Sequence, residues 1–255
     1  MSDEKVLTKE IAEQFLAEEG SWDLSEPVYL DEFNAIEDAA ARLLSYSPAE
    51  LDFSGLMSLS DDAAQSLGMH SGELILGGEA VDHEGGSRVV LIEVSPKQAA
   101  SLSAHPHLTI TLKTNSTAQE EEIISELVRS GNWPMIQINV DGESPVDQNR
   151  AQMLCKYKAN YFIDMPEGLT DSIASALSKH EGKLWFVGFD EISDAAAESL
   201  AAHRGTLDIE EVTKMSETAA RCLLKHEGKL IVSSYGLTKS AAAILRKHPS
   251  FADED

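Results

Sequence analysis

Apolar and polar positions recur along this chain with a period of about 23 residues. The pentapeptide His-Glu-Gly-Lys-Leu occurs at 180–184 and again at 226–230, and a related one, His-Arg-Gly-Thr-Leu, lies between them at 203–207. With these aligned, residues 192–203 match residues 215–226 without gaps. A fixed period of this length is typical of proteins built from stacked repeats.

One apolar position of the repeat can be followed through the whole chain, and it predicts about ten units. Its occupants are Phe15, Leu43, Leu67, Leu102, Leu127, Leu154, Leu177, Leu200, Leu223 and Leu245. The spacing is regular towards the C-terminus and irregular towards the N-terminus. Another position holds six of the eight histidines, namely His70, His105, His180, His203, His226 and His248.

Each unit predicts one short helix. Serine or threonine stands at the N-cap position, where a side-chain oxygen can accept a hydrogen bond from a free backbone amide. These N-caps are Ser60, Ser95, Thr170, Ser193, Ser216 and Thr238. Ala196, Ala197 and Leu200 share one helix face, which suits close packing. The histidine is expected to cap the helix end, and the glycine two residues later is expected to adopt a left-handed conformation.

Each unit also predicts one short strand, in which the outer residues face the core and the middle residue points away. The strands are expected at 51–53, 74–76, 108–110, 136–138, 161–163, 184–186, 207–209 and 230–232. Stacked units of one parallel strand and one helix form a curved array, because strands pack about 4.8 Å apart and helices about 8–10 Å apart.

This pattern resembles the leucine-rich repeat family, in a bacterial-looking variant with repeats of about 23 residues. The resemblance covers essentially the whole chain and rests on the leucine-x-apolar strand with its following apolar positions, such as Leu184, Phe186, Phe189 and Ile192. It implies an α/β fold, a right-handed solenoid (horseshoe) with a parallel concave sheet and convex short helices. The family's asparagine ladder is missing, with Phe189, Val212 and Tyr235 near its positions.

The chain is therefore expected to form a single solenoid domain over residues 1–255. Residues 1–29 are expected to be a worn N-terminal cap, residues 237–255 a C-terminal cap and tail, and residues 77–94 an insertion. The insertion predicts a hairpin with Gly85-Gly86 at its tip. Asp82, His83 and Glu84 offer ligands for a cation there, although polar residues in turns are usually only solvated.

Composition narrows the possible partners. The chain is 42% hydrophobic and 25% charged, which is typical of a folded protein, and its net charge is −24. That charge disfavours nucleic acids and anionic membranes. It would attract a cationic partner, although acidic surfaces also serve solubility. Cys155 and Cys222 are too few for a disulfide framework or a zinc site. The acidic start and the lack of a membrane-spanning apolar run predict a cytoplasmic location.

The sequence carries no catalytic, phosphate-binding or metal-ligand motif, so we expect no enzymatic activity, cofactor or metal site. The middle positions of the strands are the better candidate site. They place Phe162, Trp185 and Ile231, with Val187, in an apolar patch on the concave face, and they add the carboxylates of Asp23, Asp52 and Asp208. Exposed aromatic residues on a rigid surface are typical of contact sites.

We therefore predict a protein-binding scaffold in which Trp185 and Phe162 anchor a partner of unknown identity. The three aspartates are expected to determine which charge is preferred on that partner. One alternative is a structural protein that pairs through the apolar patch as a homo-oligomer. A third, less favoured alternative is a metal-responsive module that uses the histidines or the insertion.

Overall fold

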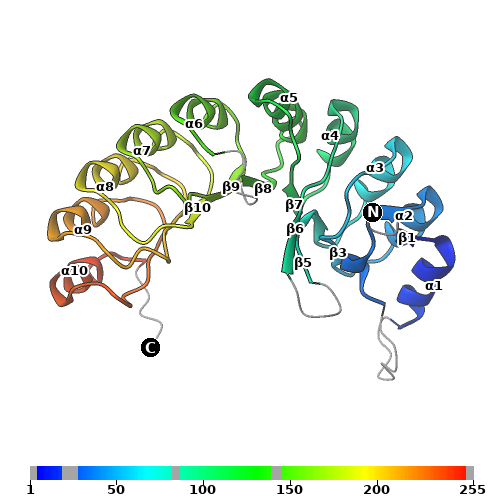
Figure 1. Cartoon of the computed structure of the whole chain (residues 1–255), viewed down its shortest axis with the longest axis horizontal. Helices are drawn as coiled ribbons and strands as arrows, with labels where there is room; N and C mark the ends of the chain where they lie inside the picture. The colour runs from blue at the N-terminus through cyan, green and yellow to red at the C-terminus, as the bar shows by residue number, and fades with distance from the viewer. Residues whose placement is uncertain (1–4, 19–27, 82–86, 139–144, 251–255) are drawn as a thin grey trace. The chain divides into compact units, whose positions relative to one another are not determined.

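The protein is an α/β structure in which short helices alternate with parallel strands. The structure is a computed structural model and describes residues 5–18, 28–81, 87–138 and 145–250. These residues divide into two compact units, one ending at Gln137 and the other starting at Ile138. Within each unit the helices lie side by side on one side of the strands (Figure 1).

The first unit holds a parallel sheet in the order β8-β7-β4-β3. Its strands are β3 Leu51–Phe53, β4 Leu74–Leu76, β7 Leu108–Thr111 and β8 Met135–Ile138. Its helices are α1 Lys9–Glu18, α2 Asp38–Leu44, α3 Asp61–Leu67, α4 Pro96–Leu102 and α5 Thr117–Leu127, with a 3₁₀ turn, η1, at Leu30–Glu32. A separate parallel pair joins β1 Val6–Leu7 to β2 Ala35–Ile36.

The second unit repeats the same arrangement with greater regularity, in the strand order β12-β11-β10-β9. Its strands are β9 Asn160–Asp164, β10 Leu184–Val187, β11 Leu207–Asp208 and β12 Leu230–Ile231. Its helices are α6 Gln148–Leu154, α7 Asp171–Leu177, α8 Asp194–Leu200, α9 Glu217–Leu223 and α10 Lys239–Leu245.

Strand pairing follows the repeat that the sequence predicts. Tyr161 pairs with Leu184, Leu184 with Leu207 and Leu207 with Leu230, so neighbouring strands are offset by 23 residues. All four side chains are buried at 0–1% exposure. The predicted alternation of inward and outward strand residues is therefore confirmed in this sheet.

The predicted helix starts are also confirmed. In each helix that begins at a predicted N-cap, the serine or threonine oxygen accepts a hydrogen bond from the backbone amide three residues later. Several caps also join successive helices, since Ser216 Oγ donates to Asp194 of the preceding helix and Ser193 Oγ donates to Asp171. The cap thus stabilises both its own helix and the stacking of the repeats.

The repeat position assigned to Leu43 is wrong by one residue. Helix α2 ends at Leu44, which is fully buried, whereas Leu43 is only half-buried. Leu44 lies 23 residues before Leu67 and follows the buried pair Ala40-Ala41. Two consecutive leucines satisfy the pattern equally, so only packing distinguishes them.

The expected alignment of strand 136–138 with strand 108–110 is also shifted. Ile136 pairs with Ile110, and Gln137 therefore lies beside Thr111. Thr111 Oγ1 donates a hydrogen bond to Gln137 Oε1 at 2.7 Å. Helix α5 between these strands has 11 residues rather than the usual seven, so the intervening segment does not follow the regular repeat.

The repeated histidines form a ladder of buried, stacked rings that we call the histidine ladder. In the second unit the ring centroids of His180, His203, His226 and His248 follow one another at 6.2, 5.8 and 6.2 Å. In the first unit His70 stacks on His105 at 5.7 Å. All six rings are at most 4% exposed. The ladder is therefore part of the core that joins one repeat to the next.

These rings do not cap their own helices, so that expectation is wrong. In three of them Nε2 donates across the stack to the preceding repeat: His180 to Ala159 O at 2.9 Å, His226 to Gly205 O at 3.1 Å, and His248 to His226 O at 2.7 Å. His105 instead accepts a hydrogen bond at Nδ1 from the His107 amide at 3.1 Å. The helix ends are satisfied by backbone groups instead, as when the His203 amide donates to Leu200 O. Burial lowers the pKa of His203 to about 4, so its ring is neutral at pH 7.

The glycine after each histidine is also required for a reason that the sequence does not indicate. Gly72, Gly182, Gly205 and Gly228 do not have the positive φ expected of a left-handed helix end. A Cβ atom on Gly205 would collide with the carbonyl oxygen of Gly182 in the preceding repeat. Gly182 and Gly228 face the same obstacle in the repeats before them. Glycine is needed because the backbones of adjacent repeats approach closely here.

The insertion after β4 contains the predicted hairpin. Strand β5 Gly78–Val81 pairs antiparallel with β6 Ser87–Val90. Its expected tip, with Asp82, His83, Glu84 and Gly85-Gly86, lies outside the described residues, as do residues 19–27 of the expected N-terminal cap. Within the part of the chain that the structure describes, no helix is long and apolar enough to cross a membrane.

Candidate functional site

The second unit places four outward-facing side chains in one row across the sheet, which we call the central row. Strand register puts Phe162 beside Trp185, Trp185 beside Asp208 and Asp208 beside Ile231. The neighbouring residues in each strand, such as Leu184 and Phe186, are buried towards the helices. The central row therefore lies on the face of the sheet that carries no helix (Figure 1).

Two aromatic rings form the apolar part of the central row. Phe162 and Trp185 meet edge to face, with ring centroids 4.9 Å apart. Both remain partly exposed, as do Ile231 and Val187. The apolar patch predicted from the sequence thus exists within one unit. Because the rings hold each other in place, they form a preformed surface that loses little side-chain entropy when a partner binds.

Lys183 completes this cluster, and sequence reasoning missed it. Its Nζ lies 4.4 Å from the centroid of the Trp185 ring and 3.2 Å from Asp208 Oδ2. The side chain of Lys183 is 27% exposed. The alternation of strand residues could have found it, because residues 183 and 185 point to the same face of the strand.

Asp208 is not the exposed charge that the sequence predicts. It is only 4% exposed, beneath its ion pair with Lys183, and among the described residues its Oδ1 has no hydrogen-bond partner. A buried carboxylate oxygen without a donor is costly, so Asp208 is poised to accept one more hydrogen bond.

The other two predicted aspartates do not join this cluster. Asp52 belongs to the first unit, where it pairs with Ile75 and its Oδ1 accepts a hydrogen bond from the Ser54 amide at 2.9 Å. This bond assigns Asp52 a local role in the turn after β3. Asp23 lies outside the described residues.

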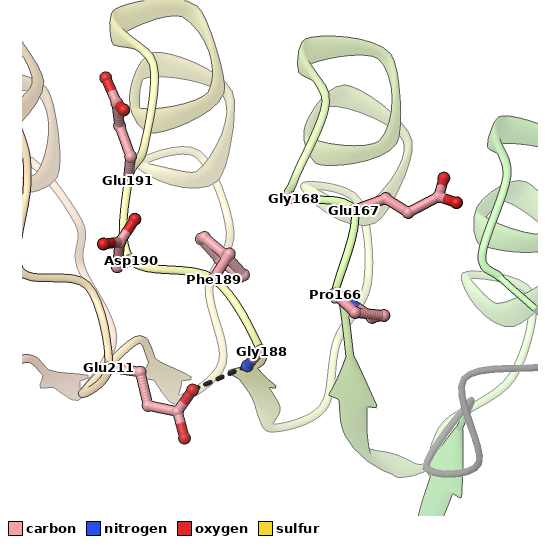
Figure 2. A pocket seen from close by; sticks show the side chains of 8 residues that line it. All are labelled: Pro166, Glu167, Gly168, Gly188, Phe189, Asp190, Glu191 and Glu211. Carbon is pink, nitrogen blue, oxygen red and sulfur yellow. Dashed lines mark hydrogen bonds between the residues drawn. The ribbon is translucent and has the colours of Figure 1, made fainter.

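A hollow of about 460 Å³ opens where β9 and β10 end, directly beyond the central row. Two loops and one residue of the next repeat line it: Pro166, Glu167, Gly168, Gly188, Phe189, Asp190, Glu191 and Glu211. Figure 2 shows Phe189 between Asp190 and Pro166, so the hollow has an apolar wall between acidic groups.

The edge of the sheet around this hollow is strongly acidic. Segments 164–168, 188–191 and 210–214 contain six carboxylates and one lysine. We call the six the acidic rim: Asp164, Glu167, Asp190, Glu191, Glu210 and Glu211. The lysine, Lys214, forms an ion pair with Asp190 at 2.6 Å. The rim therefore carries a net negative charge close to the aromatic rings.

Two members of the acidic rim are held in defined positions. Glu211 Oε2 accepts a hydrogen bond from the Gly188 amide at 2.7 Å, as Figure 2 shows. Asp164 lies against the same residue, since a Cβ on Gly188 would collide with Asp164 Oδ1. Burial, and then the charge of Glu211, raise the pKa of Asp164. A cation placed between these two carboxylates would relieve their repulsion.

The described residues contain no cluster of three or more His, Cys, Asp or Glu side chains arranged to hold a metal ion. No family model, curated protein or solved structure matches the chain. The chemistry of the site therefore rests on its geometry: exposed aromatic rings beside a rim of carboxylates on a rigid sheet.

Proposed function

We propose that the chain is a right-handed solenoid of the leucine-rich repeat kind, and that it is a non-enzymatic scaffold that binds another protein through its concave sheet face. Support for the solenoid comes from the 23-residue offset between paired strands and from the stacked histidine ladder. The free thiols of Cys155 and Cys222 suit a cytoplasmic location, which we propose as well.

One observation carries the proposed function. Phe162 and Trp185 stay partly exposed on the helix-free face although 60 apolar side chains of the described chain are buried. Interacting aromatic rings on a rigid surface are the residues on which interface energies most often depend. The rings also lie on strands, which position side chains more rigidly than loops do.

We expect Trp185→Ala to weaken partner binding by about 2 kcal/mol or more, because a central interface tryptophan is a typical hot spot. The partner would be captured from a native lysate with the unaltered chain and with Trp185→Glu, and its affinity for Trp185→Ala then measured by calorimetry. Tyr46→Ala is a matched control, since Tyr46 is an exposed aromatic residue of the first unit. Unchanged affinity of a folded Trp185→Ala chain would refute the site.

The main alternative is self-assembly through the same rings, since the apolar part of the central row could pair with a second copy. The net charge of −24 opposes it, because like-charged copies repel. Light scattering is expected to show a monomer at physiological salt. A stable dimer that Trp185→Glu converts to a monomer would favour self-assembly over the scaffold.

The metal-responsive module is the weakest alternative. The ladder nitrogens that make hydrogen bonds across the stack donate to backbone carbonyl oxygens, and all six rings are buried. A metal would have to break these bonds and separate the stacked repeats.

A further inference from the structure

The helix-free face of the second unit has an uneven charge distribution. The residues that precede the central row on the same face include Lys183 and Lys229, whereas the acidic rim follows it. Lys183 is already paired with Asp208, and Lys214 is already paired with Asp190. The excess charge on the side of the hollow is therefore negative, directly beside the exposed rings.

From this charge complementarity, we propose that the occupant of the face is an extended segment of a partner protein that carries an apolar side chain and, two positions away, a lysine or arginine. The apolar side chain would rest on Phe162 and Trp185, and the cation would bind at Asp164 and Glu211. This inference rests on the proposed function and adds the chemistry of the partner to it.

The spacing of the two subsites fits an extended chain. Along a strand, side chains on one face repeat every two residues, or about 6.6 Å. Trp185 and Val187 of β10, and Phe162 and Asp164 of β9, are separated in this way. An extended partner segment that runs along these strands has the same repeat, so its next side chain on that face lies above Asp164.

The hollow suits a long cationic side chain. Lysine and arginine bury their methylene groups on apolar surface while the charged end reaches a carboxylate. Phe189 and Pro166 provide the apolar wall, and Glu211 is already oriented by the Gly188 amide. Burial raises the pKa of Asp164, and the negative charge of Glu211 raises it further, so the two carboxylates lie close enough to repel each other.

The face already contains one example of this chemistry. Lys183 places its own ammonium group over the Trp185 ring and against Asp208, whose second oxygen lacks a donor. A cation from a partner would meet the same combination of ring and carboxylate one step further along the strands. An acidic segment would instead meet the carboxylates of the rim, which opposes its binding.

The test is selection of a phage-displayed library of random linear peptides on the purified full chain, followed by affinity measurements with the enriched peptides as synthetic probes. We expect the enriched peptides to share an apolar residue with lysine or arginine two positions away. Their affinity should fall about tenfold for Asp164→Asn combined with Glu211→Gln, and should decline as salt is raised. These two substitutions preserve size and leave an oxygen to accept the Gly188 hydrogen bond.

Glu198→Gln is the matched control, because it removes one carboxylate from the exposed side of helix α8 and should leave affinity unchanged. Thermal melting of every variant verifies that it is folded. Enriched peptides that lack a basic residue, or that bind the Asp164/Glu211 variant as tightly as the unaltered chain, would overturn the inference. Failure to enrich any peptide would overturn it too.

The same peptides separate this inference from the proposed function. If Trp185→Ala abolishes their binding and the carboxylate variant does not, the scaffold surface stands and the basic partner is wrong. If neither change affects binding, both proposals fail. If both changes weaken binding, both are supported.

Discussion

Lowering the pH from about 8 to about 5 is expected to destabilise the second unit by about 2 kcal/mol or more, because the buried ring of His203 in the histidine ladder is neutral in the folded chain. Burial, and then the charges that His180 and His226 carry when protonated, lower the pKa of His203 to about 4. The pKa values of His180 and His226 are themselves lowered, mainly by burial. A protonated ring would lose its hydration in the core, and it would repel a stacked neighbour that is also protonated.

The direction follows from proton binding. Between about pH 6.5 and about pH 4, His203 of the unfolded chain is protonated while His203 of the folded chain is not. The unfolded chain therefore binds more protons, and the free energy of unfolding falls as the pH is lowered through this window. At about pH 5 a histidine with these values costs about 2 kcal/mol relative to pH 8.

Urea unfolding of the full chain at several pH values measures this loss. The variant His203→Phe tests whether this loss comes from His203, because a phenylalanine ring can stack in the ladder but cannot be protonated. The substitution also breaks no well-aligned hydrogen bond, since His203 only faces the Gly182 carbonyl. The variant should lose about 2 kcal/mol less between pH 8 and pH 5 than the unaltered chain. His107→Gln, which removes an exposed histidine outside the ladder, should change the pH dependence far less. An identical dependence in His203→Phe would show that acid acts elsewhere.

Replacing Gly205 by alanine is expected to cost about 3 kcal/mol or more, since the added methyl group forces two backbones apart. The new Cβ would collide with the Gly182 carbonyl oxygen and would lie 2.8 Å from both the carbonyl carbon of Gly182 and the ring of His203. Neither carbonyl atom can move unless the spacing between repeats changes. The loss would appear in urea unfolding and as a lower melting temperature.

Gly168→Ala is the matched control for this change. Gly168 has a φ of +86°, and nothing lies within 4 Å of the position of its Cβ. Alanine at position 168 is destabilised only by the strain of the left-handed backbone, about 1 kcal/mol. Equal losses of unfolding free energy at Gly168 and Gly205 would contradict this explanation. They would mean that glycine does not recur two residues after histidine because adjacent repeats approach closely there.

The ladder and its glycines have a common explanation in the stacking of repeats. Each repeat presents a backbone carbonyl to its successor, as Gly205 does to the ring of His226 and also to Gly228, which has no side chain there. A histidine and a glycine two residues apart are thus both adapted to the same carbonyl of the preceding repeat. This accounts for the recurrence of the pair at a constant interval.

The candidate site could be predicted only in part. The alternation of strand residues correctly placed Phe162, Trp185, Val187 and Ile231 on one face, because the direction of a strand side chain depends on local backbone geometry. The exposure expected for Asp208 was wrong, because it depends on where Lys183, just before the neighbouring strand β10, places its ammonium group.

The acidic rim and its hollow were missed for a similar reason. Asp164 and Glu211 are 47 residues apart in the sequence; Asp164 ends strand β9, and Glu211 lies in the turn after β11, which is not adjacent to β9. Both carboxylates nevertheless lie against Gly188. The sequence offered only a weak signal, since residues 164, 187 and 210 occupy equivalent positions in successive repeats but the middle one is valine, so the carboxylates do not recur with the period of the repeat.

The sequence by itself determined the period, the alternation of short helices and strands, and the N-caps of helices α3, α4, α7, α8, α9 and α10, because these depend on interactions within a few residues. Leu43 and Leu44 show its limit, since both satisfy the local pattern and only Leu44 is buried against the neighbouring repeat. The tertiary structure alone decided what the histidines and glycines do. Their partners are carbonyl groups about one repeat away, and a local pattern carries no information about which carbonyl a stacked neighbour will present.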